Sequence, residues 1–293
     1  MAGITETEHL QIEAANASGR TPVVFVHGLW LLPSSWDRWR TMFDEAGYST
    51  LAPGWPDDPA TVAEANSRPE ILANKSIKDV AEHLELVIRQ LEIKPAVIGH
   101  SFGGLLTQIL AGRGLSAASV AIDPAPFRGV LPLPISALRA AAPVLTNPFN
   151  YGKAVPLNLA QFRYAFANAV SDEEARRLHA TYAVPAPGKP VFQAAAANIN
   201  PWTEAKVDTK NPARGPLLIL DGEKDNVVPW SIANASYNRQ RGNPGVTEIA
   251  LIPGRGHSLT IDDGWRLVAQ AALAFVGRFV APSAMVAAPP TAS

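Results

Sequence analysis

The residues best suited to covalent chemistry lie in one short stretch, Ala96-Val97-Ile98-Gly99-His100-Ser101-Phe102-Gly103-Gly104. Its apolar start is typical of a buried strand, and the residues that follow it continue as an apolar helix. Ser101 therefore occupies the centre of a Gly-x-Ser-x-Gly pattern between a strand and a helix, which is the sequence form of a nucleophile elbow. Gly99 and Gly103 leave room for strand and helix to approach closely, so that a sharp turn can present the serine hydroxyl as a nucleophile.

A carboxylate and an imidazole follow Ser101 in the order that serine catalysis can use. Asp225 lies in a polar turn after the apolar run Leu217–Leu220. His257 ends the glycine-rich loop that follows the strand-like run Thr247–Ile252. In such a set the imidazole takes the proton of the serine and the carboxylate orients the imidazole. The chain order Ser101, Asp225, His257 differs from the chymotrypsin and subtilisin orders.

With these motifs the chain resembles the α/β-hydrolase family, over roughly residues 20 to 280. The run Val23-Val24-Phe25-Val26-His27-Gly28-Leu29-Trp30 matches the His-Gly pair that the family places after its third strand. The resemblance implies that the backbone N–H groups of Leu29 and Phe102 form an oxyanion hole. It also places the segment containing Trp30 beside the serine, as a possible part of the substrate site. A serine at the elbow argues against haloalkane dehalogenases and epoxide hydrolases, relatives that carry aspartate there.

A second aspartate competes for the role of the triad acid. Asp123 follows the strand-like run Ser119–Ile122, and some members of the family take their acid from the end of that strand. We favour Asp225, because Gly222-x-x-Asp225-x-x-Val228-Pro229 matches the commoner pattern, in which the acid turn leads into the next helix.

Composition narrows the classes of partner. The chain has 293 residues, 47% of them hydrophobic, and a formal net charge of −1, which offers no electrostatic case for nucleic acid or an anionic membrane surface. It contains no cysteine, and no histidines and carboxylates show metal-ligand spacing, so we expect neither a metal nor another cofactor. His9, His83 and His179 have polar neighbours and are expected on the surface. Met1 to Gln11 lack the apolar stretch of a secretory signal, which favours a cytoplasmic location.

The alternation of elements predicts an α/β fold, with a mostly parallel, doubly wound sheet and an inserted helical cap. Residues 1–123 and 217–281 would form the α/β-hydrolase core domain, and Ile4 to Ile12 offer material for one additional edge strand. Residues 124–216 would form the cap, since this segment holds half of the chain's 26 prolines and breaks the alternation. Residues 282–293 are predicted to be a disordered tail. The six expected strands are Val23–Val26, Ser49–Ala52, Ala96–Ile98, Ser119–Ile122, Leu217–Leu220 and Thr247–Ile252.

The cap is also rich in aromatic residues, which would form the wall of an apolar pocket above the serine. Phe162, Tyr164 and Phe166 are the predicted substrate contacts, because they cannot all share one face of a helix. The alternative is that these rings hold the cap together.

These features predict an enzyme that cleaves small-molecule carboxylic esters or lactones with apolar acyl or aryl groups. The same residues could cleave amides, carbamates or C–C bonds, or support perhydrolysis or cofactor-free oxygenation. A receptor that senses a small ligand in the capped pocket is a further alternative.

Overall fold

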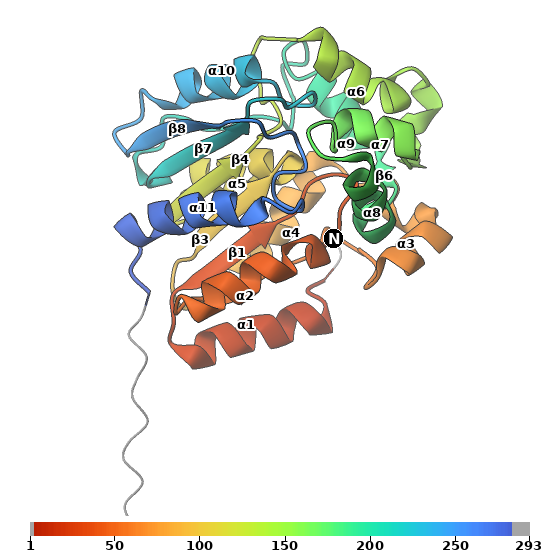
Figure 1. The fold of residues 1–293 in the computed structure, drawn as a ribbon. Helices are drawn as coiled ribbons and strands as arrows, with labels where there is room; N and C mark the ends of the chain where they lie inside the picture. The colour runs from red at the N-terminus through yellow and green to blue at the C-terminus, as the bar shows by residue number, and fades with distance from the viewer. Residues whose placement is uncertain (1–2, 283–293) are drawn as a thin grey trace, which may run out of the picture.

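The computed structural model describes residues 3–282. Six parallel strands form one sheet in the order β2-β1-β3-β4-β7-β8 (Figure 1). The strands are short, fully buried at the centre of the sheet and rich in β-branched residues, as expected for a sheet covered on both faces. Their bounds are β1 Pro22–Val26, β2 Ser49–Leu51, β3 Ala96–His100, β4 Ala118–Ile122, β7 Leu217–Gly222 and β8 Thr247–Ile252. All six expected strands are thus present, and the predicted fold class is confirmed.

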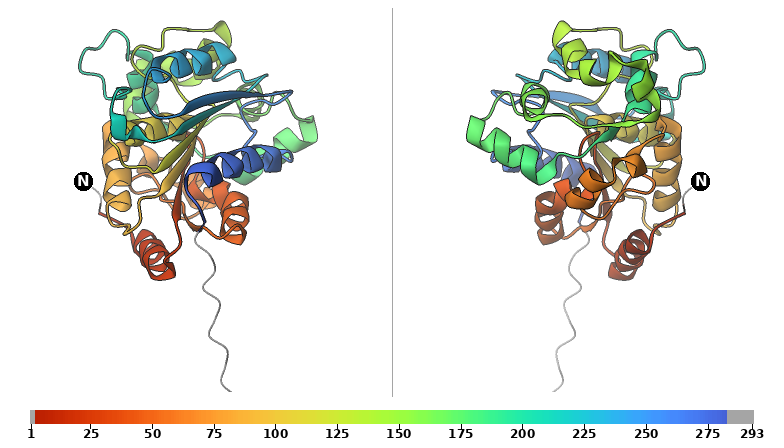
Figure 2. Two further views of the ribbon diagram at one scale, coloured as in Figure 1. Left: turned by 90° about the vertical axis from the view of Figure 1, so that its left-hand side faces the viewer. Right: turned by 90° about the vertical axis from the view of Figure 1, so that its right-hand side faces the viewer.

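Helices cover both faces of the sheet (Figures 1 and 2). On one face α2 and α11 pack with strand residues such as Phe25 and Ile98 into an aromatic core that includes Trp39 and Trp265. On the other face lie α4, α5 and α10. The bounds of these helices are α2 Asp37–Glu45, α4 Ile77–Ile88, α5 Phe102–Gly112, α10 Trp230–Gln240 and α11 Trp265–Phe279, and the connections include η1 Pro33–Trp36, α3 Val62–Ser67 and η2 Pro69–Leu72.

The N-terminal segment is a helix, and Ile4 to Ile12, which offered material for one additional edge strand, contribute none to the sheet. Helix α1 (Glu6–Ser18) begins with a capping box formed by Thr5 and Glu8, and it packs against β2 at the sheet edge. Glu8 also contacts the buried ring of His83 in α4, at 2.8 Å from Nε2. His83 is therefore not a surface residue as expected, because its ion-pairing partner lies far away in the sequence. A good helix cap outweighs the apolar alternation of this short segment.

Residues 124–216 are inserted between β4 and β7, and their elements are mainly short helices. They comprise α6 Ile135–Leu145, η3 Pro148–Gly152, α7 Leu159–Ala165, α8 Asp172–Tyr182, α9 Gly188–Ala195 and η4 Pro212–Arg214, with a two-stranded ribbon of β5 Ala154–Val155 and β6 Ala186–Pro187. We refer to this segment as the cap. Its last part, residues 208–216, returns to the amino end of the sheet, where Asn211 Nδ2 donates to the carbonyl oxygen of Gly112 and Ser119 N donates to that of Pro216. The buried side chains of the cap belong to the same apolar cluster as those of α4 and α5, so cap and sheet share a core.

Two further observations concern the chain as a whole. No helix among residues 3–282 combines the length and apolar character needed to cross a bilayer. The tail predicted for residues 282–293 lies, apart from Pro282, outside the described residues.

Candidate active site

The carboxyl ends of parallel strands meet at one edge of a sheet. Ser101, Asp225 and His257, the residues predicted to be catalytic, follow β3, β7 and β8 at that edge. Ser101 follows β3 directly and has a left-handed backbone conformation, with φ 57° and ψ −120°. The glycines on either side make this turn possible. A Cβ atom at Gly99 would lie 2.1 Å from the carbonyl oxygen of Gly103, and one at Gly103 would lie 2.0 Å from that of Val26. Side chains at either position would force the strand and helix apart.

Ser101, His257 and Asp225 form a continuous hydrogen-bonded set. The Ser101 Oγ atom lies 2.9 Å from Nε2 of His257, and Nδ1 of the same ring lies 2.5 Å from Oδ2 of Asp225. The other oxygen of Asp225 accepts hydrogen bonds from the N–H groups of Val227 and Val228, at 2.6 and 2.9 Å. These two backbone donors hold the carboxylate in its turn. The arrangement can transfer the serine proton to the imidazole.

Asp123, the alternative acid, is farther from the imidazole. Its Oδ2 atom lies 3.7 Å from Nδ1 of His257. Its Oδ1 atom accepts a hydrogen bond from the N–H of Gly222 at 2.8 Å, at the start of the loop that carries Asp225. The geometry therefore favours Asp225 as the partner of His257, whereas the hydrogen bond between Asp123 and Gly222 stabilises the loop that carries Asp225.

A third aspartate, Asp221, completes a buried cluster of carboxyl groups that the sequence reading did not single out. Oxygen atoms of Asp123, Asp221 and Asp225 all lie within 4.8 Å of one another. Burial, followed by the negative charge of Asp225, raises the pKa of Asp221 to about 8. Burial and the charges of both neighbours raise the pKa of Asp123 well above its usual value. Such spacing could suit a shared cation, but these raised pKa values favour carboxyl groups that keep their protons.

His100, the variable residue of the elbow, packs against the catalytic imidazole. Its ring lies 4.6 Å from that of His257, centroid to centroid, and is fully buried. Within residues 3–282 neither of its nitrogen atoms has a hydrogen-bond partner. Burial, followed by the charge of His257, holds its pKa well below the usual value, so that His100 is a neutral neighbour. The sequence could have pointed to both His100 and Asp221, because each lies at the carboxyl end of an apolar strand.

The segment after β1 approaches the elbow closely, as an oxyanion hole requires. A Cβ atom at Gly28 would lie 2.8 Å from Cβ of Ser101 and 3.4 Å from the backbone nitrogen of Phe102. The buried ring of His27 holds this segment, since Nδ1 contacts the carbonyl oxygen of Gly28 at 2.9 Å and Nε2 contacts Asp58 at 3.0 Å. In the described part of the chain, the N–H groups of Leu29 and Phe102 have no hydrogen-bond acceptor. Both donors are available to a ligand.

Phe166 reaches the triad from the cap, directly after α7. Its ring centroid lies 4.8 Å from that of His257 and 6.1 Å from that of Trp30. Trp30 is fixed by the cap in turn, because its Nε1 donates to the carbonyl oxygen of Val155 at 2.9 Å. Phe162 stacks on the far side of Phe166, with centroids 5.0 Å apart, and is fully buried within the cap. Phe166 thus contacts the imidazole of His257, while Trp30 and Phe162 pack against Phe166.

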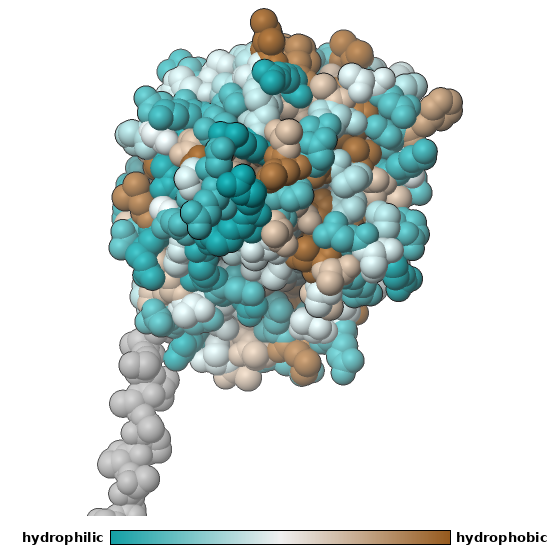
Figure 3. All heavy atoms as spheres, turned by 45° about the vertical axis from the view of Figure 1, so that its right-hand side comes forward, coloured by the Kyte–Doolittle hydropathy of each residue, from teal (hydrophilic) through white to brown (hydrophobic). Residues whose placement is uncertain are grey.

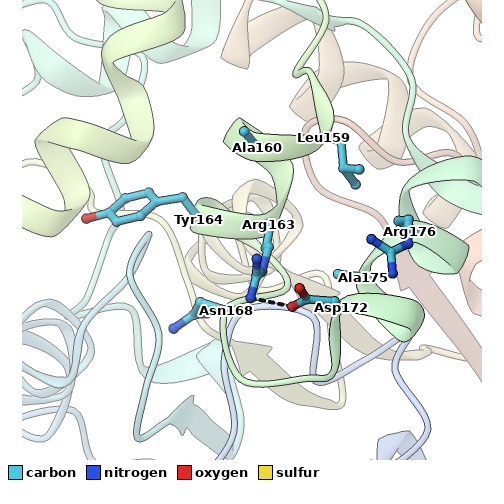
Figure 4. A pocket seen from close by; sticks show the side chains of 8 residues that line it. All are labelled: Leu159, Ala160, Arg163, Tyr164, Asn168, Asp172, Ala175 and Arg176. Atoms are coloured by element: carbon cyan, nitrogen blue, oxygen red, sulfur yellow. Dashed lines mark ion pairs between the residues drawn. The ribbon is translucent and has the colours of Figure 1, made fainter.

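Tyr164 points elsewhere. Arg139 lies over its ring at 4.0 Å, and the ring borders a cavity of about 640 Å³ on the outside of the cap (Figure 4). The lining of this cavity comes from α7, α8 and the loop between them, and consists of Leu159, Ala160, Arg163, Tyr164, Asn168, Asp172, Ala175 and Arg176. The structure therefore brings Phe166 into contact with His257 and Trp30 into contact with Phe166, whereas the ring of Tyr164 lies under Arg139.

The cap closes over the reacting groups. Ser101 is only 4% exposed, and His257 is fully buried. Hydrogen bonds join the cap to the loops that carry Asp225 and His257, among them those from Ser258 N to Phe166 O at 2.9 Å, from Asn168 Nδ2 to Lys224 O at 2.7 Å and from Asn226 Nδ2 to Tyr164 O at 2.9 Å.

The parallel sheet with helices on both faces and the hydrogen-bonded set at its carboxyl edge define the class of protein, and comparison with known proteins identifies its family. A sequence profile of the Alpha/beta hydrolase family matches residues 23–271. The chain therefore belongs to the α/β-hydrolase family, and it is a hydrolase of that family. No match was found among curated protein sequences.

Several solved structures share this fold at low sequence identity. A monoacylglycerol lipase from Paleococcus ferrophilus is 18% identical, with a TM-score of 0.62 and coverage of 88% of this chain and 94% of the lipase. A pyrethroid hydrolase from Sphingobium faniae JZ-2 is 16% identical, with a TM-score of 0.61 and coverage of 87% and 96%. A thermophilic esterase from Thermogutta terrifontis is 16% identical, with a TM-score of 0.60 and coverage of 89% and 90%. At these identities the likeness concerns the fold.

Proposed function

We propose that this protein hydrolyses carboxylic esters, including lactones, through an acyl-enzyme on Ser101. The observation that carries the proposal is the hydrogen-bonded line from Ser101 through His257 to Asp225, beside two N–H groups without acceptors. The similar structures include enzymes named as a monoacylglycerol lipase, a pyrethroid hydrolase and an esterase, which supports ester cleavage over other reactions of the fold.

In the first half of the reaction, Ser101 Oγ attacks the carbonyl carbon while His257 Nε2 takes its proton. The N–H groups of Leu29 and Phe102 stabilise the resulting oxyanion. Removal of one such donor in other enzymes costs about 3 kcal/mol of barrier. Asp225 keeps the proton of His257 on Nδ1 and stabilises the imidazolium.

In the second half, His257 returns the proton to the leaving alcohol, and the ester carbonyl remains bound to Ser101. A water molecule then gives a proton to His257 and attacks the acyl-enzyme, which releases the acid and restores Ser101. The ring of Phe166 contacts His257 and the ring of Trp30 packs on Phe166, so acyl or aryl groups with apolar surface are the favoured substrates.

The test combines a substrate panel with a covalent label. We expect p-nitrophenyl esters of graded chain length and lactones to be turned over, and anilides to react poorly. A p-nitrophenyl phosphonate should label each protein molecule once, and mass spectrometry should locate the label on the peptide that contains Ser101. The Ser101→Ala variant should lose the label and at least about a thousandfold in rate, whereas Ser231→Ala, at an exposed serine of α10, should keep both.

The outcomes separate this proposal from other chemistry on the same fold. Turnover of esters by Ser101→Ala at more than about a thousandth of the normal rate would show that serine is not the nucleophile. If anilides or carbamates were cleaved faster than esters, the same residues would be catalytic, but the substrate class would be amides or carbamates. Labelling of Ser101 without turnover of any member of the panel would point to a ligand-binding role.

A further inference from the structure

The large apolar side chains that are most exposed lie in the cap. In the described residues the six that are at least 67% exposed are Leu131, Leu133, Ile135, Phe149, Ile199 and Trp202, whereas the highest value outside the cap is 60%, at Leu10. Leu138 and Tyr151 are also exposed, at 43% and 47%. We call these eight residues the apolar cap face. Side chains exposed to this extent have no packing role in the folded chain, and large exposed apolar patches mark interaction sites.

The segments that carry the apolar cap face pack against one another. Helix α6 contacts both α9 and η3, and the rings of Tyr151 and Phe192 lie 5.8 Å apart. The loop before α6 is joined to the segment after α9, since Gly129 N donates to Asn198 Oδ1 at 2.7 Å and Asn198 Nδ2 donates to Val130 O at 2.8 Å. Figure 3 shows several hydrophobic residues standing out at the top of the molecule, with hydrophilic residues between them, and others at its left side, centre and bottom.

The charges of this region have one sign. Residues 124–171 contain no aspartate or glutamate but include Arg128, Arg139, Lys153 and Arg163, and residues 183–203 contain only Lys189. Arg163 pairs with Asp172, whereas in residues 3–282 no carboxylate pairs with Arg128, Arg139 or Lys153. The nearest acidic residue after Trp202 is Glu204, and its carboxylate accepts a hydrogen bond from Lys78 N at 2.8 Å. The segments that carry the apolar cap face thus contribute three basic side chains, Arg128, Arg139 and Lys153, that have no carboxylate partner among the described residues.

A further cation lies next to these segments. Arg239 of α10 lies against the loop before α6, because a Cβ atom at Gly129 would come within 2.4 Å of its guanidinium. The net charge of the whole chain is −1, so the positive charge of the cap is offset by an excess of negative charge elsewhere. The expectation that no membrane partner exists is based on the net charge of the whole chain. That net charge does not reveal that the cap carries an excess of positive charge and the rest of the chain an excess of negative charge.

We propose that the apolar cap face binds reversibly to an anionic lipid surface. Exposed leucine, isoleucine and aromatic side chains suit the boundary between headgroups and acyl chains, and arginine and lysine beside them suit anionic headgroups. A second copy of this chain fits less well, because two copies meeting through this face would bring like charges together. The proposal does not depend on the reaction at Ser101, and it needs no membrane-spanning helix.

Vesicle binding tests the proposal directly. We expect the protein to sediment with vesicles that contain phosphatidylcholine and phosphatidylglycerol, and at least tenfold less with phosphatidylcholine alone. Raising the salt concentration should release it. Trp202 is 86% exposed and Trp230 36%, while the other five tryptophans are buried, so acrylamide quenching reports mainly on Trp202. Binding should protect this residue from acrylamide.

Matched variants separate the apolar and charged contributions. Ile135→Ser with Trp202→Ser should weaken binding at least tenfold, whereas Leu10→Ser with Leu267→Ser, at two exposed leucines outside the cap, should not. Arg139→Gln with Lys153→Gln should remove the preference for anionic vesicles. Lys94→Gln with Arg266→Gln is the control, since Arg266, like Arg139, lies over an aromatic ring.

The circular dichroism spectrum and the rate on a water-soluble acetate ester show whether each variant is folded. Equal binding to both kinds of vesicle, or no binding, would overturn the proposal. It would also be overturned by a concentration-dependent dimer that the Ile135→Ser, Trp202→Ser variant abolishes, because a second copy would then be the occupant of this face.

Discussion

At the scale of single residues, two aspartates follow neighbouring strands, and their distances from His257 support the choice of Asp225 that the sequence pattern favours. Asp225 lies 2.5 Å from His257 Nδ1 and is held by two backbone N–H groups, whereas Asp123 lies at 3.7 Å and binds the N–H of Gly222. An amide at position 225 would offer the imidazole the wrong partner, while an amide at position 123 can still accept from Gly222.

We therefore predict that Asp225→Asn lowers kcat for ester hydrolysis by roughly four orders of magnitude, through loss of control over the His257 tautomer. Asp123→Asn should retain kcat within about tenfold. Steady-state kinetics with one p-nitrophenyl ester measure both effects, and equal thermal stability serves as the control for folding. The reverse order of the two losses would assign the triad acid to Asp123.

Asp221 leads to a prediction about pH and stability. Its pKa is raised from 3.8 to about 8 in the folded protein by burial, followed by the charge of Asp225. Between pH 4 and 8 the folded state therefore holds a proton that the unfolded state has lost. This linkage lowers the free energy of unfolding as pH rises, by up to about 1.4 kcal/mol per pH unit.

The Asp221→Asn substitution removes this linkage. The variant should gain stability relative to the parent protein between pH 5 and pH 8, and the gain should level off above pH 8. Urea denaturation across this range measures the difference, with Asp57→Asn as a control at an exposed carboxyl group. Parallel pH dependences for Asp221→Asn and the parent protein would show that Asp221 is ionised in the folded state.

At the scale of elements, the end of α7 connects the cap to the chemistry. The ring of Phe166 contacts the ring of His257. The carbonyl oxygen of Phe166 accepts a hydrogen bond from the N–H of Ser258, the residue that follows His257. The ring of Tyr164, two residues earlier, points away from the other labelled residues in Figure 4 and lies under Arg139 of α6. Phe166 and Tyr164 therefore form a matched pair for testing whether the cap selects substrates.

We predict that Phe166→Ala lowers the ratio of kcat/KM for long-chain to acetate esters by roughly ten- to two-hundredfold, the scale of one lost ring contact. Tyr164→Ala should leave that ratio unchanged. Kinetics on a series of p-nitrophenyl esters measure the ratio. A uniform loss on every ester with Phe166→Ala, together with a lower Tm, would mean that the ring serves only to pack the cap.

At the scale of the whole molecule, the cap is not separated from the sheet by a solvated boundary. Phe162 and Leu178 of the cap belong to the same buried cluster as Leu84 and Leu105 of the helices on the sheet. A continuous core of this kind favours unfolding as one unit, even though the cap is inserted into the chain between β4 and β7.

We accordingly predict a single calorimetric transition whose van't Hoff and calorimetric enthalpies agree. Phe162→Ala in the cap and Val268→Ala in α11 should each shift that whole transition to lower temperature, because both side chains are fully buried. A separate low-temperature transition in Phe162→Ala would show that the cap unfolds on its own.

Much of the fold and of the candidate site follows from local patterns in the sequence. Apolar runs predict all six strands, since a strand buried on both faces has few other compositions available to it. Gly99 and Gly103 predict a tight elbow at Ser101, because no side chain fits beside either backbone. The positions of Asp225 and His257 after their strands predict that they reach the same sheet edge as Ser101.

What only the tertiary structure decides depends on contacts between distant segments. The distances of Asp123 and Asp225 from His257, the burial of Asp221 and His100, and the contact of Phe166 with the triad all join parts of the chain far apart in sequence. The same holds for the helical N-terminus, which packs on β2, and for the apolar cap face, whose exposed residues come from separate segments. Local patterns carry no information on these contacts, because the free energy of burial and charge pairing depends on which segments meet.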